Sequence, residues 1–419
     1  MFLLYNLLLT ICAPFWVPWM LLKSRRRDER PNWQERMGIF DIPRRGEKHR
    51  IWVHTVSVGE FVAATPILRE LRKTVPNHEI VVSVTTSSGH KTAREAEPGL
   101  FDYLVYFPID VPLFQLRAMN HVWPDVLAIM ETELWFNFVW AAKSMRARTM
   151  LINGRISDRS FPRSKRLRPF YKALLREVDL CLMQTDVDLE RIKALGASDG
   201  KVLGNSKFDQ AIQGLEADPA EWREKLGLDL AKPTLVIGST RGDEEERFVL
   251  DALAEVGFER LNVIHAPRHL ERVAGLTDLV VERTGAVALR SRGESGPYMI
   301  LDTYGELSDV YSAADLVIVG GGFSNLGGQN IFQPLAHGKP VLHGVHMQNF
   351  RDVAAMADAS GAAQPCSTPE ELAAAIKGLL DDPGKREKMG RQAKKLVQEN
   401  VGASARYAKA IAEEAPKAK

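Results

Sequence analysis

Carboxylates follow two apolar segments of the chain in positions that suit general acid–base chemistry. Glu60 stands at the expected start of a helix, after the apolar run IWVH at residues 51–54. Partial burial there would raise the pKa of its carboxyl group and suit it to general-base work, whereas a surface glutamate in a first turn would only complement the helix dipole. Glu131 and Glu133 follow the run VLAIM at residues 126–130, and we expect at least one of them to face a cleft.

Three further segments could place a cation or backbone N–H groups near a phosphate. Lys207 lies in GNSKFD, where it either reaches a cleft from a hinge or is a solvated surface lysine. Ser239 and Thr240 form a small-residue turn before a helix, which exposes N–H groups to an anion, although the acidic residues that follow argue partly the other way. Arg268 and His269 come after the next apolar run, and an arginine there suits a phosphate through charge-assisted contacts.

A glycine-dense segment, GGGFSNLGGQN at residues 320–330, is the last candidate. Glycine lets a ligand approach the backbone closely, and the segment lies where a strand is expected to give way to a helix. It does not match GxGxxG, and the chain holds neither GxxxxGKS nor GxxxxGKT. These patterns argue against a Rossmann dehydrogenase and against a P-loop nucleoside triphosphatase.

Short, fully apolar runs alternate with helical patterns over most of the chain. One series extends from residue 51 to residue 183, and a second from residue 234 to residue 344. Such runs are typical of parallel strands that helices cover on both faces. The predicted fold class is therefore α/β, with two Rossmann-like domains at residues 23–211 and 212–419 that face each other across a cleft. Open α/β sheets bind ligands at the carboxyl ends of their strands, which is where the candidates lie.

Composition fits two folded domains and excludes several classes of protein. The chain has 419 residues, more than one hydrophobic core usually supports. Its net charge of +2 gives no overall attraction for nucleic acid. Cys12, Cys181 and Cys366 are far apart and lack metal-binding spacings, so neither a disulfide framework nor a structural zinc is expected.

The first residues depart from the average of a soluble protein. Residues 2–22 carry no formal charge, and about twenty such residues in a helix cross a bilayer core. The basic cluster at residues 23–27 favours the cytoplasmic side for the rest of the chain. Pro14 and Pro18 would also suit a helix that lies in one leaflet, so both arrangements stay open. A buried core helix is a further alternative, whereas a signal peptide should carry its charges first.

Taken together, these segments resemble the 3-deoxy-D-manno-octulosonic acid (Kdo) transferases of lipopolysaccharide synthesis. The resemblance extends from the N-terminal segment to about residue 360 and is carried, in order, by RPNWQERMG (30–38), HTVSVGE (54–60), TTSSG (85–89), METELW (130–135), LINGRISDRS (151–160), GNSKFD (204–209), GSTRGDEE (238–245), APRH (266–269), DTYGEL (302–307), YSAADLVIVGGG (311–322) and GKPVLHG (338–344). It implies the glycosyltransferase B arrangement, with the acceptor in the N-terminal domain and the CMP-Kdo donor mostly in the C-terminal one.

The resemblance also implies roles for the candidate residues. Glu60 would be the catalytic base, Glu131 and Lys207 would stabilise the transition state, and Arg268 with His269 would bind the donor phosphate. The other donor-binding residues would be Ser239, Thr240, Tyr304, Gly305, Glu306, Gly328, Asn330, Ile331, Phe332 and Gln333. The enzyme would use no cofactor and no metal, and would transfer Kdo with inversion to a glucosamine 6-hydroxyl of a lipid A precursor. Residues 1–22 would anchor it in the inner membrane, with the catalytic domains on the cytoplasmic face.

Two positions depart from the family pattern. Gln333 stands where the usual last loop, GGHNPLEP, has a glutamate that would hold the ribose hydroxyls, and Arg241 replaces the histidine of GSTHEGEE. The neutral Gln333 could weaken nucleotide binding by about 1 to 2 kcal/mol. Two alternatives to a Kdo transferase therefore remain. One is a glycosyltransferase B enzyme with another nucleotide sugar and a lipid-linked acceptor, and the other is a membrane-tethered protein that binds without turnover.

Overall fold

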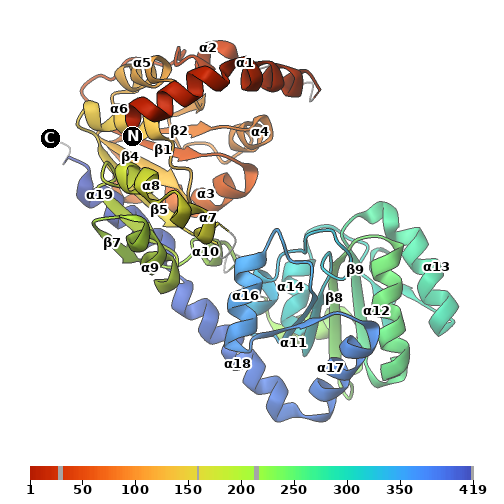
Figure 1. Cartoon of the computed structure of the whole chain (residues 1–419). Coiled ribbons are helices and arrows are strands. Elements are labelled where there is room, and N and C mark those ends of the chain that lie inside the picture. Colours follow the sequence, from red (N-terminus) through yellow and green to blue (C-terminus); the bar gives the residue numbers. More distant parts are fainter. Residues whose placement is uncertain (27–31, 158–159, 212–216, 417–419) are drawn as a thin grey trace. The chain divides into compact units, whose positions relative to one another are not determined.

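The chain forms two compact units, each with its own parallel β-sheet (Figure 1). The computed structural model describes residues 1–26, 32–157, 160–211 and 217–416. Unit 1 comprises residues 1–210 together with residues 401–419, and unit 2 comprises residues 211–400. The prediction of two parallel-sheet α/β domains is confirmed.

Unit 1 holds a seven-stranded parallel sheet in the order β3-β2-β1-β4-β5-β6-β7. The strands are β1 (Arg50–Thr55), β2 (Glu79–Val84), β3 (Tyr103–Tyr106), β4 (Val126–Met130), β5 (Arg148–Gly154), β6 (Leu180–Met183) and β7 (Gly200–Val202). The chain builds outward from β1 on one side and then resumes at β4 on the other. The carboxyl ends of β1 and β4 therefore flank the point where the strand order reverses, the usual ligand position in such sheets.

Helices cover both faces of this sheet and close two apolar cores. Phe61 and Leu68 of α3 are buried on one face, and Trp52 of β1 packs with Phe138 of α6 on the other. The helices of unit 1 are α1 (Phe2–Arg26), α2 (Trp33–Arg36), α3 (Val58–Thr74), α4 (Ser87–Arg94), α5 (Pro112–Val122), α6 (Phe136–Ser144), α7 (Phe161–Arg166), α8 (Arg168–Leu175), α9 (Asp186–Leu195), α10 (Lys207–Ala211) and α19 (Ala403–Glu414).

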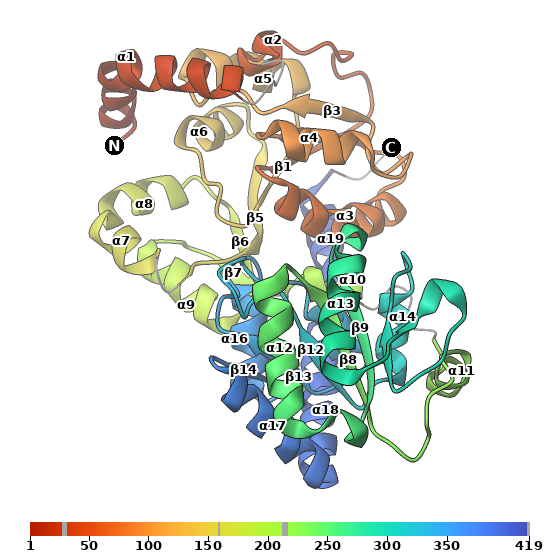
Figure 2. The same ribbon diagram turned by 90° about the vertical axis from the view of Figure 1, so that its right-hand side faces the viewer.

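Helix α19 returns from unit 2 to complete the core of unit 1. It lies beside α3 (Figure 2), where Tyr407 and Ile411 are fully buried. The Tyr407 hydroxyl donates to the carbonyl of Gly204 at 2.8 Å. The sequence predicts a second domain that continues to residue 419, whereas the structure assigns the residues from 401 onward to unit 1. The difference arises because α19 buries its apolar side against α3.

Unit 2 holds a second seven-stranded parallel sheet, in the order β10-β11-β9-β8-β12-β13-β14. Its strands are β8 (Thr234–Thr240), β9 (Asn262–Pro267), β10 (Ala288–Leu289), β11 (Tyr298–Ile300), β12 (Leu316–Val319), β13 (Val341–Gly344) and β14 (Ala363–Cys366). Its α-helices are α11 (Pro219–Lys225), α12 (Asp243–Val256), α13 (Val273–Thr284), α14 (Leu307–Ala313), α15 (Phe332–Ala336), α16 (Arg351–Ser360), α17 (Pro369–Asp381) and α18 (Pro383–Asn400). The order reverses between β8 and β12, so the equivalent ligand position lies at their carboxyl ends.

The uncharged N-terminal segment forms α1, which packs on unit 1 by one side. The rings of Phe2 and Trp140 lie 4.5 Å apart, and the Tyr5 hydroxyl donates to Asp110 at 2.8 Å. Its other side exposes the apolar side chains of Leu3, Leu4, Leu7, Leu8, Ile11 and Phe15. Within the described ranges, no helix has an apolar stretch long enough to cross a membrane, so the structure does not support a spanning anchor. The side chains of the basic cluster at 23–27 lie outside the described residues.

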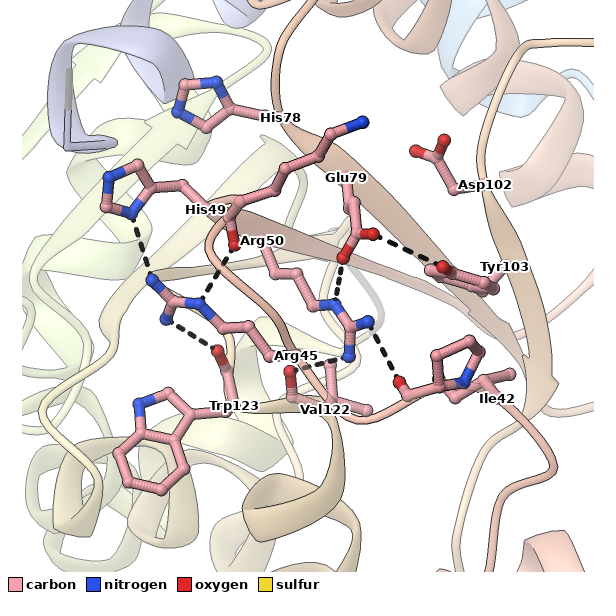
Figure 3. A network of polar contacts seen from close by, with 12 residues as sticks. Ile42, Arg45, His49, Arg50, His78, Glu79, Asp102, Tyr103, Val122 and Trp123 are labelled. Atoms are coloured by element: carbon pink, nitrogen blue, oxygen red, sulfur yellow. Dashed lines mark hydrogen bonds and ion pairs between the residues drawn. The ribbon is translucent and has the colours of Figure 1, made fainter. Parts of the chain in front are cut away.

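A network of polar contacts closes the amino ends of β1 and β2 (Figure 3). Arg50 is fully buried and donates from Nε to Glu79 at 2.5 Å. Its two other nitrogens donate to the carbonyl groups of Val122 and Pro43, at 3.3 and 2.9 Å. The guanidinium also lies over the ring of Tyr103, 5.2 Å from its centroid. All three guanidinium nitrogens are thus satisfied inside unit 1.

Candidate active site

Glu60 lies in the first turn of α3, directly after β1. The N–H of Glu60 donates to Ser57 Oγ, while Ser57 Oγ and the N–H of Val56 donate to the Glu60 carboxylate at 3.3 and 2.7 Å. This arrangement resembles a capping box, with the backbone N–H of Val56 in the place of that of the N-cap residue Ser57. The residue is only 9% exposed, and burial, together with the negative charges of Glu131 and Glu133, raises its pKa to about 8. Glu60 therefore both caps the helix and is far more basic than a surface glutamate.

Glu131 follows β4 and meets Lys207 from the start of α10. Oε1 of Glu131 lies 3.1 Å from Nζ of Lys207, and both side chains are partly buried. Glu131 has a φ of +53°, a left-handed conformation that is costly for a residue other than glycine and is kept where the surroundings enforce it. Its N–H donates to the carbonyl of Ile152 in β5 at 3.0 Å. This hydrogen bond to β5 holds Glu131 beside Lys207 at the carboxyl ends of the strands.

Glu133 is the third carboxylate at this edge. Burial and the nearby Glu131 raise its pKa. Like charges in a small volume oppose one another's ionisation. Glu60, on α3, is affected in the same way, because the charges of Glu131 and Glu133 raise its pKa. We call Glu60, Glu131, Glu133 and Lys207 the carboxylate–lysine cluster. Because its pKa lies near 8, Glu60 can exchange a proton close to neutral pH.

Polar contacts fix the loop before Lys207 to the body of unit 1. Asn153 in β5, at a φ of +50°, accepts from the N–H of Ser206 at 3.2 Å. Ser206 Oγ donates to the Ala63 carbonyl in α3 at 2.8 Å, and Asn205 accepts from the N–H of Lys207 at 3.0 Å. Asn153 and Ser206 are not among the predicted site residues. Their only signal in the sequence is their place inside LINGRISDRS and GNSKFD.

In unit 2, the end of β8 and the loop after β9 hold four predicted donor residues. Ser239 has a φ of +62°, and Thr240 is fully buried with its hydroxyl 2.9 Å from Nε2 of His265. The Thr240 side chain is therefore held inside unit 2. Arg268 and His269 are exposed, and the N–H of Arg268 donates to the Thr240 carbonyl at 2.9 Å. A backbone hydrogen bond thus joins the end of β8 to the loop after β9.

The segment DTYGEL follows β11. The Tyr304 ring is exposed, and Gly305 has a φ of +86°. Glu306 pairs with Arg290 at 3.0 Å and accepts a hydrogen bond from Thr303. Burial works against ionisation, yet these hydrogen bonds hold the pKa of Glu306 below its usual value. Glu306 is therefore a fixed, ionised acceptor beside an exposed aromatic ring.

The last predicted segment follows β12. Gly328 has a φ of +79°, which favours glycine. Ile331 and Phe332 are buried, so their side chains belong to the core of unit 2. Asn330 is exposed and accepts from the N–H of Phe332 at 2.9 Å, and Gln333 is half-buried. Of the predicted residues in this segment, Asn330 and Gln333 are therefore the ones whose side chains solvent can reach.

The structure sorts the predicted residues into two groups. It brings Glu60, Glu131 and Lys207 together at the carboxyl ends of β1 and β4 in unit 1. The predicted donor residues follow β8, β9, β11 and β12, which are adjacent in the sheet of unit 2. Among the described residues, no group of three or more His, Cys, Asp or Glu could hold a metal ion. Metal-free chemistry stays a prediction.

Two family models match the chain. Residues 31–210 match the model described as 3-deoxy-D-manno-octulosonic-acid transferase (kdotransferase), and residues 299–396 match that of glycosyl transferases group 1. A 3-deoxy-D-manno-octulosonic acid transferase of Haemophilus influenzae is 28% identical over 414 residues, 95% of each chain. One of Chlamydophila psittaci is 32% identical over 80% of this chain and 78% of that one.

Two further similarities accompany these. A bifunctional glycosyltransferase/methyltransferase of Fusobacterium nucleatum is 31% identical over 84% of this chain, which spans 55% of its length. Among solved structures, MurG of Acinetobacter baumannii shares the fold, with a TM-score of 0.58 and 15% identity over 87% of this chain and 99% of that one. From the first family model and the curated relatives, the chain belongs to the 3-deoxy-D-manno-octulosonic acid transferase family of glycosyltransferases.

Proposed function

We propose that this protein moves Kdo from CMP-Kdo to a glucosamine 6-hydroxyl of a lipid A precursor, with inversion. The observation that carries the proposal is the carboxylate–lysine cluster, in which Glu60 is buried with a pKa of about 8 and Glu131 pairs with Lys207. Family membership supports the choice of donor and acceptor. The cluster supports turnover over binding alone, because a binding protein has no need of a basic, buried carboxylate.

Glu60 is the general base of the proposed reaction. It takes the proton of the acceptor hydroxyl while that oxygen bonds to the anomeric carbon of Kdo. The bond from the anomeric carbon to the phosphate oxygen breaks on the opposite face, its electron pair leaves with CMP, and the configuration inverts. The hydrogen bonds from Val56 and Ser57 to the Glu60 carboxylate keep it oriented.

In the proposed reaction, Glu131, Lys207 and Arg268 stabilise the charges that develop during the transfer. Positive charge grows on the sugar ring, where a carboxylate such as Glu131 stabilises it, and negative charge grows on the departing phosphate. Lys207 and Arg268 supply positive charge for that phosphate. These two cations could do the work of a metal ion, so we propose a metal-independent reaction.

The donor would be bound by the loops after β8, β9, β11 and β12 in unit 2. The exposed Arg268 suits the phosphate, and the backbone N–H groups beside Ser239 suit its oxygens. The ionised Glu306 and the exposed Tyr304 suit the nucleoside. Gln333 would accept one hydrogen bond from the ribose without adding charge.

We also infer that unit 1 works at the cytoplasmic face of the inner membrane. The exposed apolar side of α1 suits the boundary between headgroups and acyl chains, where an interfacial helix lies. Flotation with anionic phospholipid vesicles tests this inference. The parent should float, and Leu4→Glu with Leu8→Glu should not; equal flotation would contradict it. Thr10→Ser, on the same helix, is the matched control.

Gln333 favours a second candidate, a transferase that uses a different nucleotide sugar. Titrations with CMP, UDP and GDP separate the two candidates, because the nucleotide provides most of the contacts expected in unit 2. Tight binding of CMP supports the first candidate, and preference for UDP or GDP supports the second.

The direct test is incubation with CMP-Kdo and a tetra-acylated lipid A precursor, followed by mass spectrometry of the lipid. The parent should add at least one Kdo, and Glu60→Gln should add far less in the same time. A parent protein that leaves the lipid unchanged in the presence of vesicles would overturn the proposal.

A further inference from the structure

Glu245 joins two loops of unit 2 through a single buried carboxylate. It lies in the first turn of α12 and is fully buried. The N–H of Arg241 donates to Oε2 at 2.7 Å, and the N–H of Phe323 donates to Oε1 at 3.1 Å. One side chain thus accepts two backbone hydrogen bonds, one from the loop after β8 and one from the loop after β12.

These two loops touch each other closely. A Cβ on Gly320 would lie 2.6 Å from Cα of Thr240, so only glycine permits the approach. The N–H of Gly320 also donates to the carbonyl of Gly238 at 2.8 Å. Beyond that bond, Ser239 and Gly321 both adopt positive φ, at +62° and +77°. Ser239 forms an irregularity of the strand pairing near the end of β8, and Gly321 lies beyond the end of β12, so contacts from a side chain help to fix this backbone.

The charge of Glu245 is balanced by backbone dipoles. Burial raises the pKa of this carboxyl group, while the backbone N–H groups of Gly321, Arg241 and Phe323 favour its ionised form. A buried carboxylate is costly unless it is well hydrogen-bonded, so its hydrogen bonds from Arg241 and Phe323 point to a demand for precise loop geometry.

We propose that Glu245 is a positioning residue for the donor site, whose carboxylate fixes the spacing between the loop of Ser239 and the glycine-dense turn at 320–328. The inference rests on the proposed function, since these are the loops expected to cradle the CMP phosphate. Glu245 acts through the backbone N–H groups that it orients. Removing the Glu245 carboxylate should therefore weaken donor binding and leave acceptor binding unchanged.

Asp315 provides a matched control at the opposite end of the same two strands. It precedes β12 and accepts from the N–H of Thr234, the first residue of β8, at 2.8 Å. It also pairs with Arg223 at 3.0 Å. Like Glu245, it is a carboxylate that ties β8 to the chain next to β12, but it does so at the amino ends of these strands.

The experiment compares the full-length parent with Glu245→Ala, Glu245→Gln and Asp315→Ala. Amide hydrogen exchange is followed by mass spectrometry in peptides that cover 238–243 and 320–328, and CMP binding and donor and acceptor KM are measured on the same proteins. In Glu245→Ala, exchange in both peptides should accelerate, and CMP affinity should fall by about 10- to 100-fold, the scale of lost charge-assisted hydrogen bonds. The donor KM should rise more than kcat falls, with the acceptor KM unchanged.

The two other variants separate positioning from simple destabilisation. Glu245→Gln keeps one acceptor oxygen and should recover part of the affinity. Asp315→Ala should lower Tm while exchange in both loops and CMP affinity stay close to those of the parent. Parent-like exchange in Glu245→Ala, or equal loss of CMP affinity in Asp315→Ala, would overturn the proposal. If Glu245→Ala does not fold, Glu245→Gln carries the same comparison. A parent that does not bind CMP would refute the proposed function, whereas the exchange data would still decide whether Glu245 fixes the loops.

Discussion

The two ends of the sheet in unit 1 hold charged side chains in opposite ways. At the amino ends of the strands, Arg50 donates from all three guanidinium nitrogens and pairs with Glu79 at 2.5 Å. At the carboxyl ends, Glu131 of the carboxylate–lysine cluster pairs with Lys207, and the two other carboxyl groups of the cluster have raised pKa values. The amino ends pair their charges, whereas the carboxyl ends hold more carboxyl groups than cations.

We infer from this difference that the charges at the amino ends of the strands serve stability and that those at the carboxyl ends serve reactivity. A buried charge whose three nitrogens all donate hydrogen bonds within the unit is held for stability and is not accessible to a substrate. A carboxylate whose ionisation is opposed by burial and by its neighbours is ready to take a proton. The excess of carboxyl groups lies at the strand ends where open α/β sheets bind ligands, so these groups are placed where a substrate is expected to bind.

The largest effect should come from Glu60→Gln. The substitution keeps size and most hydrogen bonding but removes the basicity, so turnover should fall by about two to four orders of magnitude. Single-turnover Kdo transfer at saturating donor and acceptor measures the effect. CMP affinity serves as the control and should barely change, because the donor is assigned to unit 2. Transfer at the parent's rate would remove Glu60 as the base and make Glu131 the next candidate.

Arg50→Met should have the opposite profile. It leaves Glu79 without its buried partner, and breaking such a pair lowers the free energy of unfolding by about 3 to 5 kcal/mol. Urea denaturation measures the loss, while kcat per folded molecule should remain that of the parent. Adding Glu79→Leu should restore part of the stability. A fully stable single variant would show that this end of the sheet does not need its ion pair.

Lys207→Met tests the pair at the other end. Loss of a cation from a preorganised site should reduce transfer by about 100- to 1,000-fold. The free energy of unfolding should change by no more than about 1 kcal/mol, because both partners are partly exposed. Transfer assays and urea denaturation on one preparation give both numbers. A large loss of stability with little loss of transfer would mean that Lys207, like Arg50, has a structural role, and would contradict the difference proposed between the two ends of the sheet.

The smallest effect concerns pH. The folded-state pKa of Glu60 is about 8 against an ordinary value of 4.5, so between these values the folded protein binds more protons than the unfolded chain. The stability that this group contributes is present below pH 4.5 and is lost as pH rises through about 8. Between pH 5.5 and 8.5 the loss should be about 1 to 3 kcal/mol. Urea denaturation at the two values should show it in the parent and a smaller slope in Glu60→Gln; identical slopes would mean that Glu60 titrates normally.

Both sheets were predictable because strands buried on two faces must be apolar throughout, and runs such as VLAIM at 126–130 have few other uses. Glu131 and Lys207 were also predictable as candidates, since each follows a strand of the sheet that now holds them 3.1 Å apart. The sequence could not say that Glu60 both caps α3 and is basic, because the second property depends on burial in the folded unit and on carboxylates more than seventy positions away.

Other features depend on packing that no local pattern records. The uncharged segment 2–22 suggested a membrane span because a count of apolar residues does not show that Phe2 and Tyr5 pack on α6 and Asp110. The helical pattern of α19 gave no sign of which unit it completes. The bonds from Arg241 and Phe323 to Glu245 join segments almost eighty positions apart, and glutamate in a first turn looks the same with or without them.

The return of α19 also sets an order of events during synthesis. Unit 1 needs Tyr407 and Ile411 to cover α3, yet these residues leave the ribosome only after all of residues 211–400. At roughly 5 to 20 residues per second, that intervening stretch takes roughly 10 to 40 s to translate. Throughout that interval the nascent unit 1 keeps an apolar face uncovered and open to chaperones, while unit 2, whose residues are contiguous, can close as soon as it emerges. The domain that the ribosome begins first is therefore the one that is finished last.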